Sequence, residues 1–386
     1  MPKQTEIAKL IRNAVEVLPE GGLERKLAFD RPLRVKLGID PTAPDIHLGF
    51  AVVLDRLAAF QRAGHTVVLI IGDYTARIGD PSGRSNERPV LPDEVLDRNA
   101  ELFAEQAFRT LDRERTEVRF NSEWLGKLTF AEVVRLTRTI TVARLLERDD
   151  FEKRFRARAP ISLSELLYPP TQAYDSVAVQ ADIEIGGSDQ LFNLLAGREV
   201  MPHYGLEPQV VITFPLLVGL DGVDKMSKSK GNYIGVAEAP EEQFGKVMSI
   251  PDSALPQWWG LLIGDLPTLD DPMEWKLELA RRIVERWHGS EAAATAEAHF
   301  TRVVRRHEAP EATEEAALPA GDPLHLPALL VDFLGLGSTS DARRMVAQGG
   351  VKLNGEVIRD LDVSRARLEG ALVQAGKRRF VSFRKS

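Results

Sequence analysis

The chain has no cysteine among its 386 residues, which excludes disulfides, thiol chemistry and the usual structural zinc sites. It also has no apolar run long enough to span a bilayer. The first 18 residues are amphipathic and carry both signs of charge, unlike a signal or transit peptide. Together these absences predict a cytoplasmic protein.

An overall excess of positive charge is also missing, since the net charge of the chain is -7. The charge is unevenly distributed: residues 325–386 carry +5, and the preceding 324 residues carry -12. A basic C-terminal module on an acidic body predicts a local anionic partner at that end. The alternative is a basic segment that is only solvated.

The sequence does contain an alternation of apolar strands and amphipathic helices. "RPLRVKLGID" (31–40) and "TVVLIIGDYT" (66–75) are predicted as buried parallel strands, with a turn and a helix between them. Residues 181–219 repeat the alternation of strand and helix. This pattern predicts an α/β fold with a Rossmann-like doubly wound parallel sheet, whose ligands bind beyond the carboxyl ends of the strands.

The second half of the chain has a different pattern. It is predicted helical from about Glu238 to His307, and residues 305–323 are rich in Pro, Ala and Glu, as linkers are. A small α+β pattern follows, in which "STSDARRMVAQGG" predicts a capped helix and "VKLNGEVI" a hairpin around Asn-Gly.

Two polar segments lie at expected strand ends. In "GIDPTAPDIHLGF", Gly49 allows a ligand close to the backbone, while His47 and Thr42 offer polar atoms to a phosphate. In "DGVDKMSKSKGNYIG", Lys225 and Lys228 are point charges suited to mobile phosphate oxygens. Alone, the first segment is an ordinary capped turn and the second a solvated face.

A third polar set is spaced for one face of a helix. Tyr168, Gln172 and Asp175 stand at i, i+4 and i+7, and a carboxylate among them could accept a hydrogen bond from a phenol. "GDPSGRSNER" adds Asp80 after a strand, followed by two arginines. By itself, this last segment is also an ordinary turn.

The motifs taken together resemble a known family. "HLGF" and "KMSKS" are similar to the two signatures of class I aminoacyl-tRNA synthetases, and "IGDPSG", "QAYD" and "GGSDQ" extend the resemblance to bacterial-type tyrosyl-tRNA synthetases. The resemblance implies activation of tyrosine with ATP and transfer of tyrosyl to tRNA(Tyr). It implies magnesium carried with ATP, no structural metal, and a homodimer with no membrane attachment.

The resemblance also implies domains and residue roles. The domains are a catalytic domain with a dimerisation insertion (1–220), the KMSKS loop (221–235), a helical anticodon-stem-binding domain (236–308), a linker (309–323) and a small basic RNA-binding domain (324–386). Tyrosine would be bound by Lys36, Gly38, Asp80, Tyr168, Gln172, Asp175 and Gln190. ATP would be bound by Asp40, Gly49, Gly187, Asp189, Met226, Ser227 and Lys228. The catalytic residues would be Thr42, His47, Arg84, Arg88, Lys225 and Lys228. RNA would be bound by Arg343, Arg344, Lys352 and Asn354.

The chain departs from the family pattern at several positions. Lys36 replaces a tyrosine that touches the phenol, Glu184 replaces a glutamine, and Phe50 replaces the last signature histidine. Pro169 and Pro170 predict a helix start or a kink. Two alternatives stay open: a tryptophanyl-tRNA synthetase, and an inactive synthetase scaffold that binds RNA.

Overall fold

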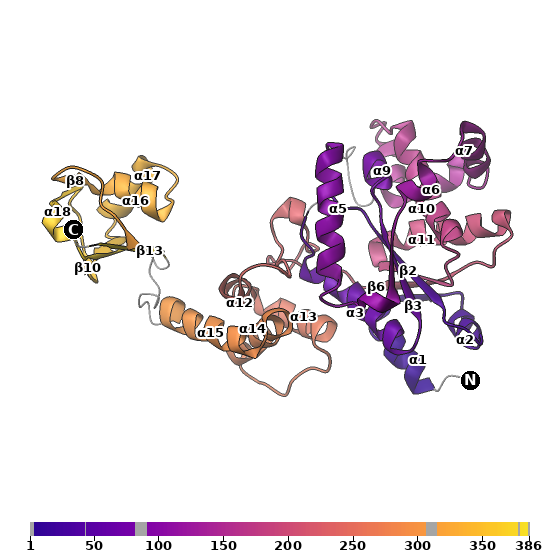
Figure 1. Cartoon of the computed structure of the whole chain (residues 1–386), viewed down its shortest axis with the longest axis horizontal. Coiled ribbons are helices and arrows are strands. Elements are labelled where there is room, and N and C mark those ends of the chain that lie inside the picture. The colour runs from indigo at the N-terminus through magenta and orange to yellow at the C-terminus, as the bar shows by residue number, and fades with distance from the viewer. Residues whose placement is uncertain (1–3, 43, 82–90, 306–314, 377–378, 385–386) are drawn as a thin grey trace. The chain divides into compact units, whose positions relative to one another are not determined.

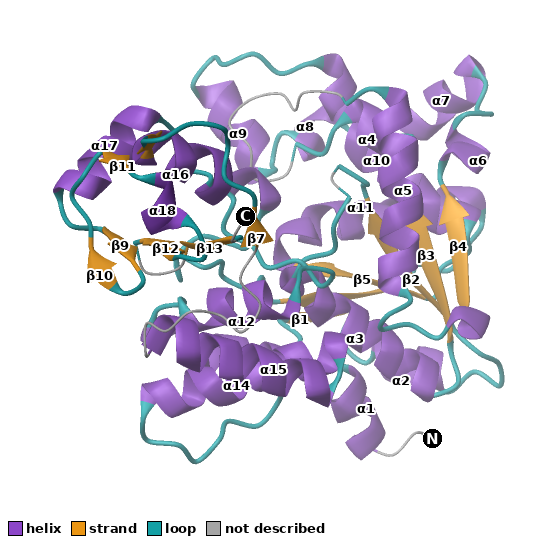
Figure 2. Cartoon of the chain, turned by 60° about the vertical axis from the view of Figure 1, so that its left-hand side comes forward, coloured by secondary structure: helices purple, strands orange, loops and turns teal. Residues whose placement is uncertain are grey.

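The computed structural model describes residues 4–42, 44–81, 91–305, 315–376 and 379–384 (Figures 1 and 2). The chain forms two compact units. One consists of Met1–Ala239 with Lys246–Leu279, and the other of Pro240–Gly245 with Ala280–Ser386. The segment predicted as helical, 236–308, is therefore divided between the two units.

The first unit is built on a six-stranded sheet in the order β1-β6-β5-β2-β3-β4. The strands are β1 (Glu16–Leu18), β2 (Arg34–Ile39), β3 (Thr66–Ile71), β4 (Thr116–Phe120), β5 (Ile183–Gly187) and β6 (Val210–Phe214). All are parallel except β1, which pairs antiparallel with β6. The predicted doubly wound fold is confirmed, and the strand order reverses between β2 and β5, where such sheets bind ligands.

Local sequence explains the central elements. Strand β3 is "TVVLII", and all of its residues after the first are buried, as expected for a strand covered on both faces. Helix α3 (Leu48–Arg62) begins at the N-cap His47 and buries Leu54, Leu57 and Phe60. The predicted strand, helix and strand from 31 to 75 are thus confirmed.

The first unit contains further helices, some of which pack on other helices rather than on the sheet. They are α1 (Gln4–Leu10), α2 (Gly22–Leu27), α4 (Thr75–Ile78), α5 (Asp93–Ala107), α6 (Ser122–Leu125), α7 (Phe130–Thr137), α8 (Val142–Leu145), α9 (Asp149–Arg156), α10 (Leu163–Ala178), α11 (Leu191–Val200) and α13 (Leu255–Leu262). Two further helices, α12 (Pro240–Met248) and α14 (Pro272–His288), are divided between the units.

Helix α10 begins earlier than its prolines suggest. A capping box between Ser162 and Glu165 starts the helix at Leu163, so Pro169 and Pro170 lie inside it. The alternative of a helix start at the prolines is wrong, because the capping box satisfies the first turn six residues upstream.

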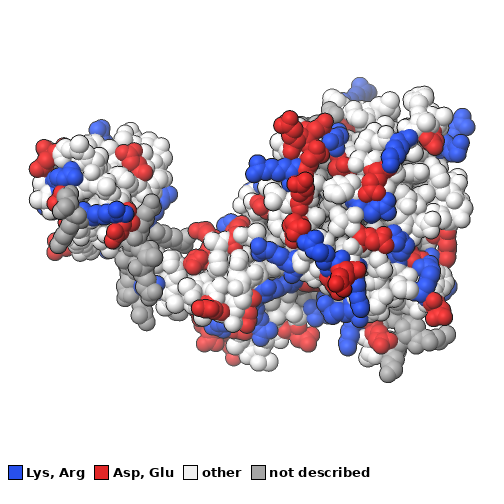
Figure 3. Space-filling model, viewed as in Figure 1, with Lys and Arg blue, Asp and Glu red and all other residues white. Residues whose placement is uncertain are grey.

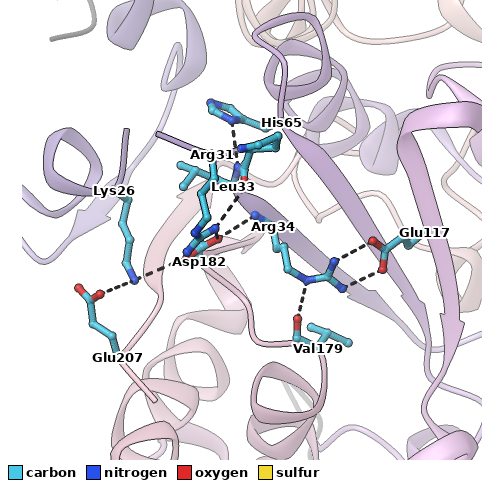
Figure 4. A network of polar contacts seen from close by, with 10 residues as sticks. Lys26, Arg31, Leu33, Arg34, His65, Glu117, Val179, Asp182 and Glu207 are labelled. Atoms are coloured by element: carbon cyan, nitrogen blue, oxygen red, sulfur yellow. Dashed lines mark hydrogen bonds and ion pairs between the residues drawn. The ribbon is translucent and has the colours of Figure 1, made fainter. Parts of the chain in front are cut away.

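A polar network ties the amino-terminal ends of the strands together (Figure 4). Both Arg31 Nη atoms lie 2.7 Å from the carboxylate of Asp182, and the Arg34 backbone N–H donates to the same group at 2.9 Å. The Arg34 guanidinium also reaches across to Glu117 on β4 at 2.7 and 2.8 Å. This network fixes one end of the sheet, while the opposite, carboxyl ends carry the cavity described below.

The second unit contains α15 (Ser290–Phe300) and a C-terminal module. The module has a five-stranded sheet in the order β10-β9-β12-β13-β7, a two-stranded sheet β11-β8, and three helices. These elements are β7 (Glu315–Ala316), β8 (Leu324–His325), α16 (Leu326–Leu334), α17 (Thr339–Ala347), β9 (Val351–Leu353), β10 (Glu356–Val357), β11 (Asp362–Val363), α18 (Arg365–Leu368), β12 (Leu372–Ala375) and β13 (Arg379–Phe383). Strand β7 thus lies within the segment assigned to the linker.

The predicted hairpin of this module is confirmed. Strands β9 and β10 pair around Asn354 and Gly355, whose φ angles are 50° and 88°, as a two-residue primed turn requires. A buried apolar cluster that includes Leu326, Leu330 and Val381 forms the core of the module. Throughout the described part of the chain, we find no helix with the length and apolarity needed to cross a membrane.

Candidate active site

A cavity of about 960 Å³ opens at the carboxyl ends of β2 and β5. Its wall also includes the start of α3, the middle of α10 and the lysine-rich loop after β6. The sequence-predicted residues that line it are Gly38, Asp40, Thr42, His47, Gly49, Asp80, Tyr168, Gln172, Asp175, Gly187, Asp189, Gln190, Lys225, Met226, Ser227 and Lys228. Segments from 38 to 230 therefore meet at one site.

The histidine turn is held by its own hydrogen bond. The backbone N–H of Gly49 donates to Nδ1 of His47 at 3.1 Å, so the neutral ring carries its proton on Nε2. Burial, then the charges of Lys228 and Lys225, lower the pKa of His47 to about 3. His47 is therefore a neutral hydrogen-bond donor at physiological pH. A Cβ at position 49 would lie 2.9 Å from the imidazole, which explains why glycine is needed there.

Phe50 supports this histidine by packing. Its ring centroid lies 4.5 Å from that of His47 and 5.5 Å from that of Phe103, in an edge-to-face arrangement with the latter. Such pairs stabilise the orientation of the rings they join. Phe50 therefore holds the imidazole in place through apolar contact.

The two signature segments are joined through the backbone. The N–H of Leu48 donates to the carbonyl of Ile234 at 2.9 Å, and the N–H of Val236 donates to the carbonyl of Ile46 at 2.8 Å. These bonds place the end of the lysine loop, at Ile234 and Val236, beside the histidine turn.

Both signature lysines have partners within the protein. Lys225 pairs with Asp189 at 2.7 Å, and Lys228 donates to the backbone carbonyl of Asp45. Burial lowers the pKa of Lys228 to about 8, against the opposing effect of Asp45. Lys228 is thus still mainly charged at neutral pH and is already held at the start of α3.

Asp175 is a buried hydrogen-bond acceptor at the inner end of the cavity. Trp124 Nε1 donates to it at 2.8 Å and Asn121 Nδ2 at 3.3 Å. Burial raises its pKa to about 6, although the charge of Lys36 and these two hydrogen bonds oppose the rise. Sequence analysis missed Trp124 and Asn121. Their signal was that they follow β4, whose carboxyl end lies at the same edge of the sheet.

Asp40 joins two other cavity residues. It accepts hydrogen bonds from the Tyr168 hydroxyl at 2.9 Å and from Thr75 Oγ1 at 2.7 Å. A Cβ at Gly72 would lie 2.1 Å from the Asp40 carboxylate, so only glycine leaves room for it. Burial, followed by the negative charge of Asp40, raises the pKa of Tyr168 well above its ordinary value. Tyr168 therefore stays protonated.

Asp80 and Gln190 are oriented by residues that sequence analysis missed. Gln190 Nε2 donates to Asp80 at 3.1 Å, and Asn193 Nδ2 donates to Gln190 Oε1 at 2.9 Å. Arg148 is buried, donates to Asn193 at 3.1 Å and lies 3.5 Å from Asp80. No sequence spacing linked Arg148 to the other three residues.

One residue predicted to bind tyrosine is not among the described residues of the cavity wall, and two predicted catalytic residues fall outside the description. Lys36 is absent from the described lining residues, and its side chain is fully buried. Arg84 and Arg88 lie outside the described residues. Nowhere in the described ranges do three His, Asp or Glu side chains come together as a metal site would need.

The residues predicted to bind RNA lie on the C-terminal module. Arg343 and Arg344 are exposed on α17, and Lys352 is half-buried on β9. Asn354 Oδ1 accepts a hydrogen bond from the backbone N–H of Leu372 at 2.8 Å, so this side chain also braces the hairpin. Basic and acidic side chains are mixed on the face of the module seen in Figure 3, so its positive charge is not concentrated there.

Comparisons with known proteins agree with this geometry. Residues 28–307 match the family model "tRNA synthetases class I (W and Y)", and residues 326–363 match the S4 domain. A tyrosine–tRNA ligase of Moorella thermoacetica is 49% identical, over 96% of this chain and 94% of the relative. One of Thermotoga maritima is 47% identical, over 98% and 97%.

Solved structures show the same fold. Tyrosyl-tRNA synthetase from Archaeoglobus fulgidus, complexed with L-tyrosine, superposes with a TM-score of 0.60 at 24% identity, over 76% of this chain and 99% of that one. A C-terminally truncated mitochondrial tyrosyl-tRNA synthetase of Aspergillus nidulans gives 0.61 at 22% identity, over 76% and 91%. With its two signatures meeting at one cavity, the chain belongs to the class I tRNA synthetases, and within them to the tyrosine–tRNA ligases.

Proposed function

We propose that the cavity activates L-tyrosine with ATP and transfers the tyrosyl group to the 3′-terminal ribose of tRNA(Tyr). The observation that carries this proposal is the meeting of Asp175, Asp80 and the two signature segments around one cavity at the sheet's reversal point. Family membership favours tyrosine over tryptophan as the substrate, because the relatives from Moorella thermoacetica and Thermotoga maritima are both tyrosine–tRNA ligases.

The phenol of tyrosine would bind at Asp175. Trp124 and Asn121 already donate to this carboxylate, so it is oriented to accept one more hydrogen bond, from the substrate hydroxyl. Phenylalanine would leave the buried carboxylate without that donor. Tyrosyl-tRNA synthetases reject phenylalanine by about 10⁵ without editing, a figure that belongs to the class and that we adopt for this chain.

The ammonium and carboxylate of tyrosine would bind at a second set of polar groups that line the cavity. Asp80 supplies negative charge, and the oxygens of Tyr168 and Gln172 can accept from an ammonium. Gln190, already bonded to Asp80, lies beside them and would contact the carboxylate. A Cβ at position 38 would meet no atom closer than 4.0 Å, so it would project into the space of the cavity. Gly38 therefore leaves this space open for the substrate.

ATP would lie between the start of α3 and the turn after β5. Gly49 and Gly187 admit the nucleotide close to the backbone, while Asp189 and Asp40 are placed to accept from ribose hydroxyls. The lysine loop, with Met226 and Ser227, would cover it. Magnesium would arrive bound to the triphosphate as part of the substrate.

Catalysis would come from positioning and charge. A tyrosine carboxylate oxygen attacks the α-phosphorus, and the bond from that phosphorus to the pyrophosphate oxygen breaks. Negative charge then moves onto pyrophosphate, where Nε2–H of His47, the Thr42 hydroxyl and the ammonium groups of Lys225 and Lys228 can stabilise it. We assign Arg84 and Arg88 to the same group from the family pattern alone. In the second step the ribose hydroxyl of tRNA attacks the tyrosyl carbonyl carbon, and AMP leaves.

The C-terminal module would bind tRNA through Arg343, Arg344, Lys352 and Asn354. A module that carries net positive charge suits the phosphate backbone. We keep the domain limits given above as part of this proposal, together with a cytoplasmic location.

A second copy of the chain would complete the enzyme. Large apolar side chains are exposed on two helices that contact each other: Phe130 on α7 and Leu163 on α10 are 84% and 76% exposed. Exposed apolar patches mark interaction surfaces. Sedimentation should therefore give a dimer that Phe130→Asp weakens, and a wild-type monomer would refute this part.

The decisive test is ATP–pyrophosphate exchange with tyrosine, tryptophan and phenylalanine in parallel, followed by charging of tRNA. We expect exchange with tyrosine alone. Exchange with tryptophan would favour a tryptophanyl enzyme, and no exchange with RNA binding retained would favour an inactive scaffold.

A further inference from the structure

A pair of opposite charges, Lys36 and Glu184, is fully buried at the cavity, where Glu184 is one of the lining residues and Lys36 is not. Lys36 Nζ lies 2.6 Å from Glu184 Oε1, and the two residues face each other in the register of β2 and β5. Their exposures are 0% and 1%. Burying a charged pair adds little net stability compared with apolar side chains of similar size. The pair therefore points to a role other than stability.

The same ammonium group connects the sheet to helix α10. Lys36 Nζ donates to the Ser176 hydroxyl at 2.9 Å and lies 3.3 Å from the backbone carbonyl of Gln172. Asp175 stands between these two contacts, on the same turn of the helix. Lys36 is thus bonded on both sides of the residue proposed to hold the phenol, while its own side chain stays outside the cavity wall.

Glu184 is held equally firmly. Its Oε2 accepts from Ser176 Oγ at 2.7 Å and from Gln209 Nε2 at 2.8 Å. A Cβ at Gly197 would lie 2.3 Å from Gln209 Nε2 and 3.2 Å from Glu184 Oε2, so the space around the pair admits only glycine there. Each charge thus has several partners in fixed positions, as preorganised support for a binding site requires.

We propose that Lys36 and Glu184 are positioning residues that fix the Gln172–Ser176 turn of α10 and thereby set the selectivity for the tyrosine hydroxyl. This inference rests on the proposed role of Asp175. Three titratable groups surround Asp175. Lys36 from β2 lowers the pKa of Asp175 and Glu184 from β5 raises it, while Tyr168 lies on the same helix as Asp175. Lys36 thus favours the ionised acceptor.

The test uses the full-length enzyme and two kinds of variant. K36M/E184Q removes both charges and leaves no unpaired ion in the interior. S176A keeps both charges and removes the hydroxyl that joins them to the helix. Tyrosine KM, ATP KM, kcat and the tyrosine/phenylalanine ratio of kcat/KM are measured by pyrophosphate exchange, and Tm by thermal unfolding.

We expect K36M/E184Q to raise tyrosine KM and lower the selectivity ratio by about tenfold or more, the usual effect of losing hydrogen bonds to a charged group. S176A should raise tyrosine KM and lower the selectivity ratio by about threefold. ATP KM should stay unchanged in both variants. Wild-type tyrosine KM and selectivity in both would overturn the inference, and S176A decides alone if the double variant does not fold.

Arg154→Met is the matched control. Arg154 on α9 forms a buried ion pair with Glu165 on α10, at 2.5 and 2.9 Å. Its loss should lower Tm but leave tyrosine KM unchanged. An equal rise in tyrosine KM would show that any loosening of α10 suffices and would overturn the specific role of Lys36.

Asp175→Asn tests the role of Asp175 separately from the role of Lys36 and Glu184. If it leaves selectivity unchanged, the phenol assignment itself fails. If it lowers selectivity while K36M/E184Q and S176A do not, only the role of Lys36 and Glu184 fails.

Discussion

Replacing Lys228 by alanine should slow adenylate formation far more than it weakens tyrosine binding. In the structure this ammonium group is tied to the carbonyl of Asp45 just before α3, close to His47. Removing one preorganised donor from developing negative charge typically costs about 10²–10³ in rate. Because the contact strengthens as charge moves onto pyrophosphate, we expect this loss in the rate constant for adenylation, with the tyrosine dissociation constant changed by less than about twofold.

The pKa of Lys228 adds a second, independent readout. Since burial lowers this pKa to about 8, about nine in ten molecules carry the charge at pH 7 and about one in ten at pH 9. The kcat/KM for ATP, which reports the free enzyme, should therefore fall about tenfold per pH unit well above pH 8. Lys228→Arg keeps a charge throughout this range and should remove that fall.

Stopped-flow measurement of adenylate formation, with tyrosine binding measured at equilibrium, separates the possible results. A Lys228→Ala enzyme that loses tyrosine affinity as strongly as rate would refute a transition-state role. A fall in kcat/KM above pH 8 that persists in Lys228→Arg would show that another group titrates.

Three further predictions follow from other parts of the molecule. Phe50→His should not speed adenylation, because the natural ring packs on His47; pre-steady-state rates above wild type would contradict this. Asp182→Asn should lower the free energy of unfolding by about 1–3 kcal/mol at pH 7. Burial raises the pKa of Asp182, but hydrogen bonds from its arginine partner and a backbone N–H lower it below the ordinary value, so this contribution is present above about pH 4 and is lost as pH falls through the lowered pKa. Urea titrations at pH 7 and pH 3 should show a smaller difference at pH 3, and an equal difference would contradict the assignment. The double variant Arg343→Ala, Arg344→Ala should raise the KM for tRNA in charging assays while leaving pyrophosphate exchange intact. A loss of exchange would show that these arginines do something other than bind tRNA.

Sequence patterns predicted the parts of this fold whose signals are local. Strand β3 is a continuous apolar run, and Asn354-Gly355 has the turn chemistry of a hairpin. The cavity was predictable because parallel strands end at one edge, which brings together His47, after β2, and Asp189, after β5, even though they are far apart along the chain.

Sequence patterns did not predict how the polar side chains divide their contacts. Lys36 was expected to contact tyrosine, but its ammonium group pairs with Glu184, and Lys36 is not among the described residues that line the cavity. Arg148 was missed because its partners are distant in sequence and no spacing connects them, whereas Trp124 was missed although its position after β4 was a usable signal. Such pairings depend on tertiary packing, which brings together side chains that are far apart in the sequence.

The backbone bonds between the two signature segments have a consequence for how their sequences can vary. Because Leu48 N–H and Val236 N–H are the donors, the link is indifferent to side-chain identity at those positions, and only proline would abolish a donor. A conventional alanine scan would miss this link entirely. Proline is well tolerated at the first position of a helix, which Leu48 occupies. Proline at that position would therefore remove one of the two bonds while the helix itself is retained, and the bond from Val236 to Ile46 would remain.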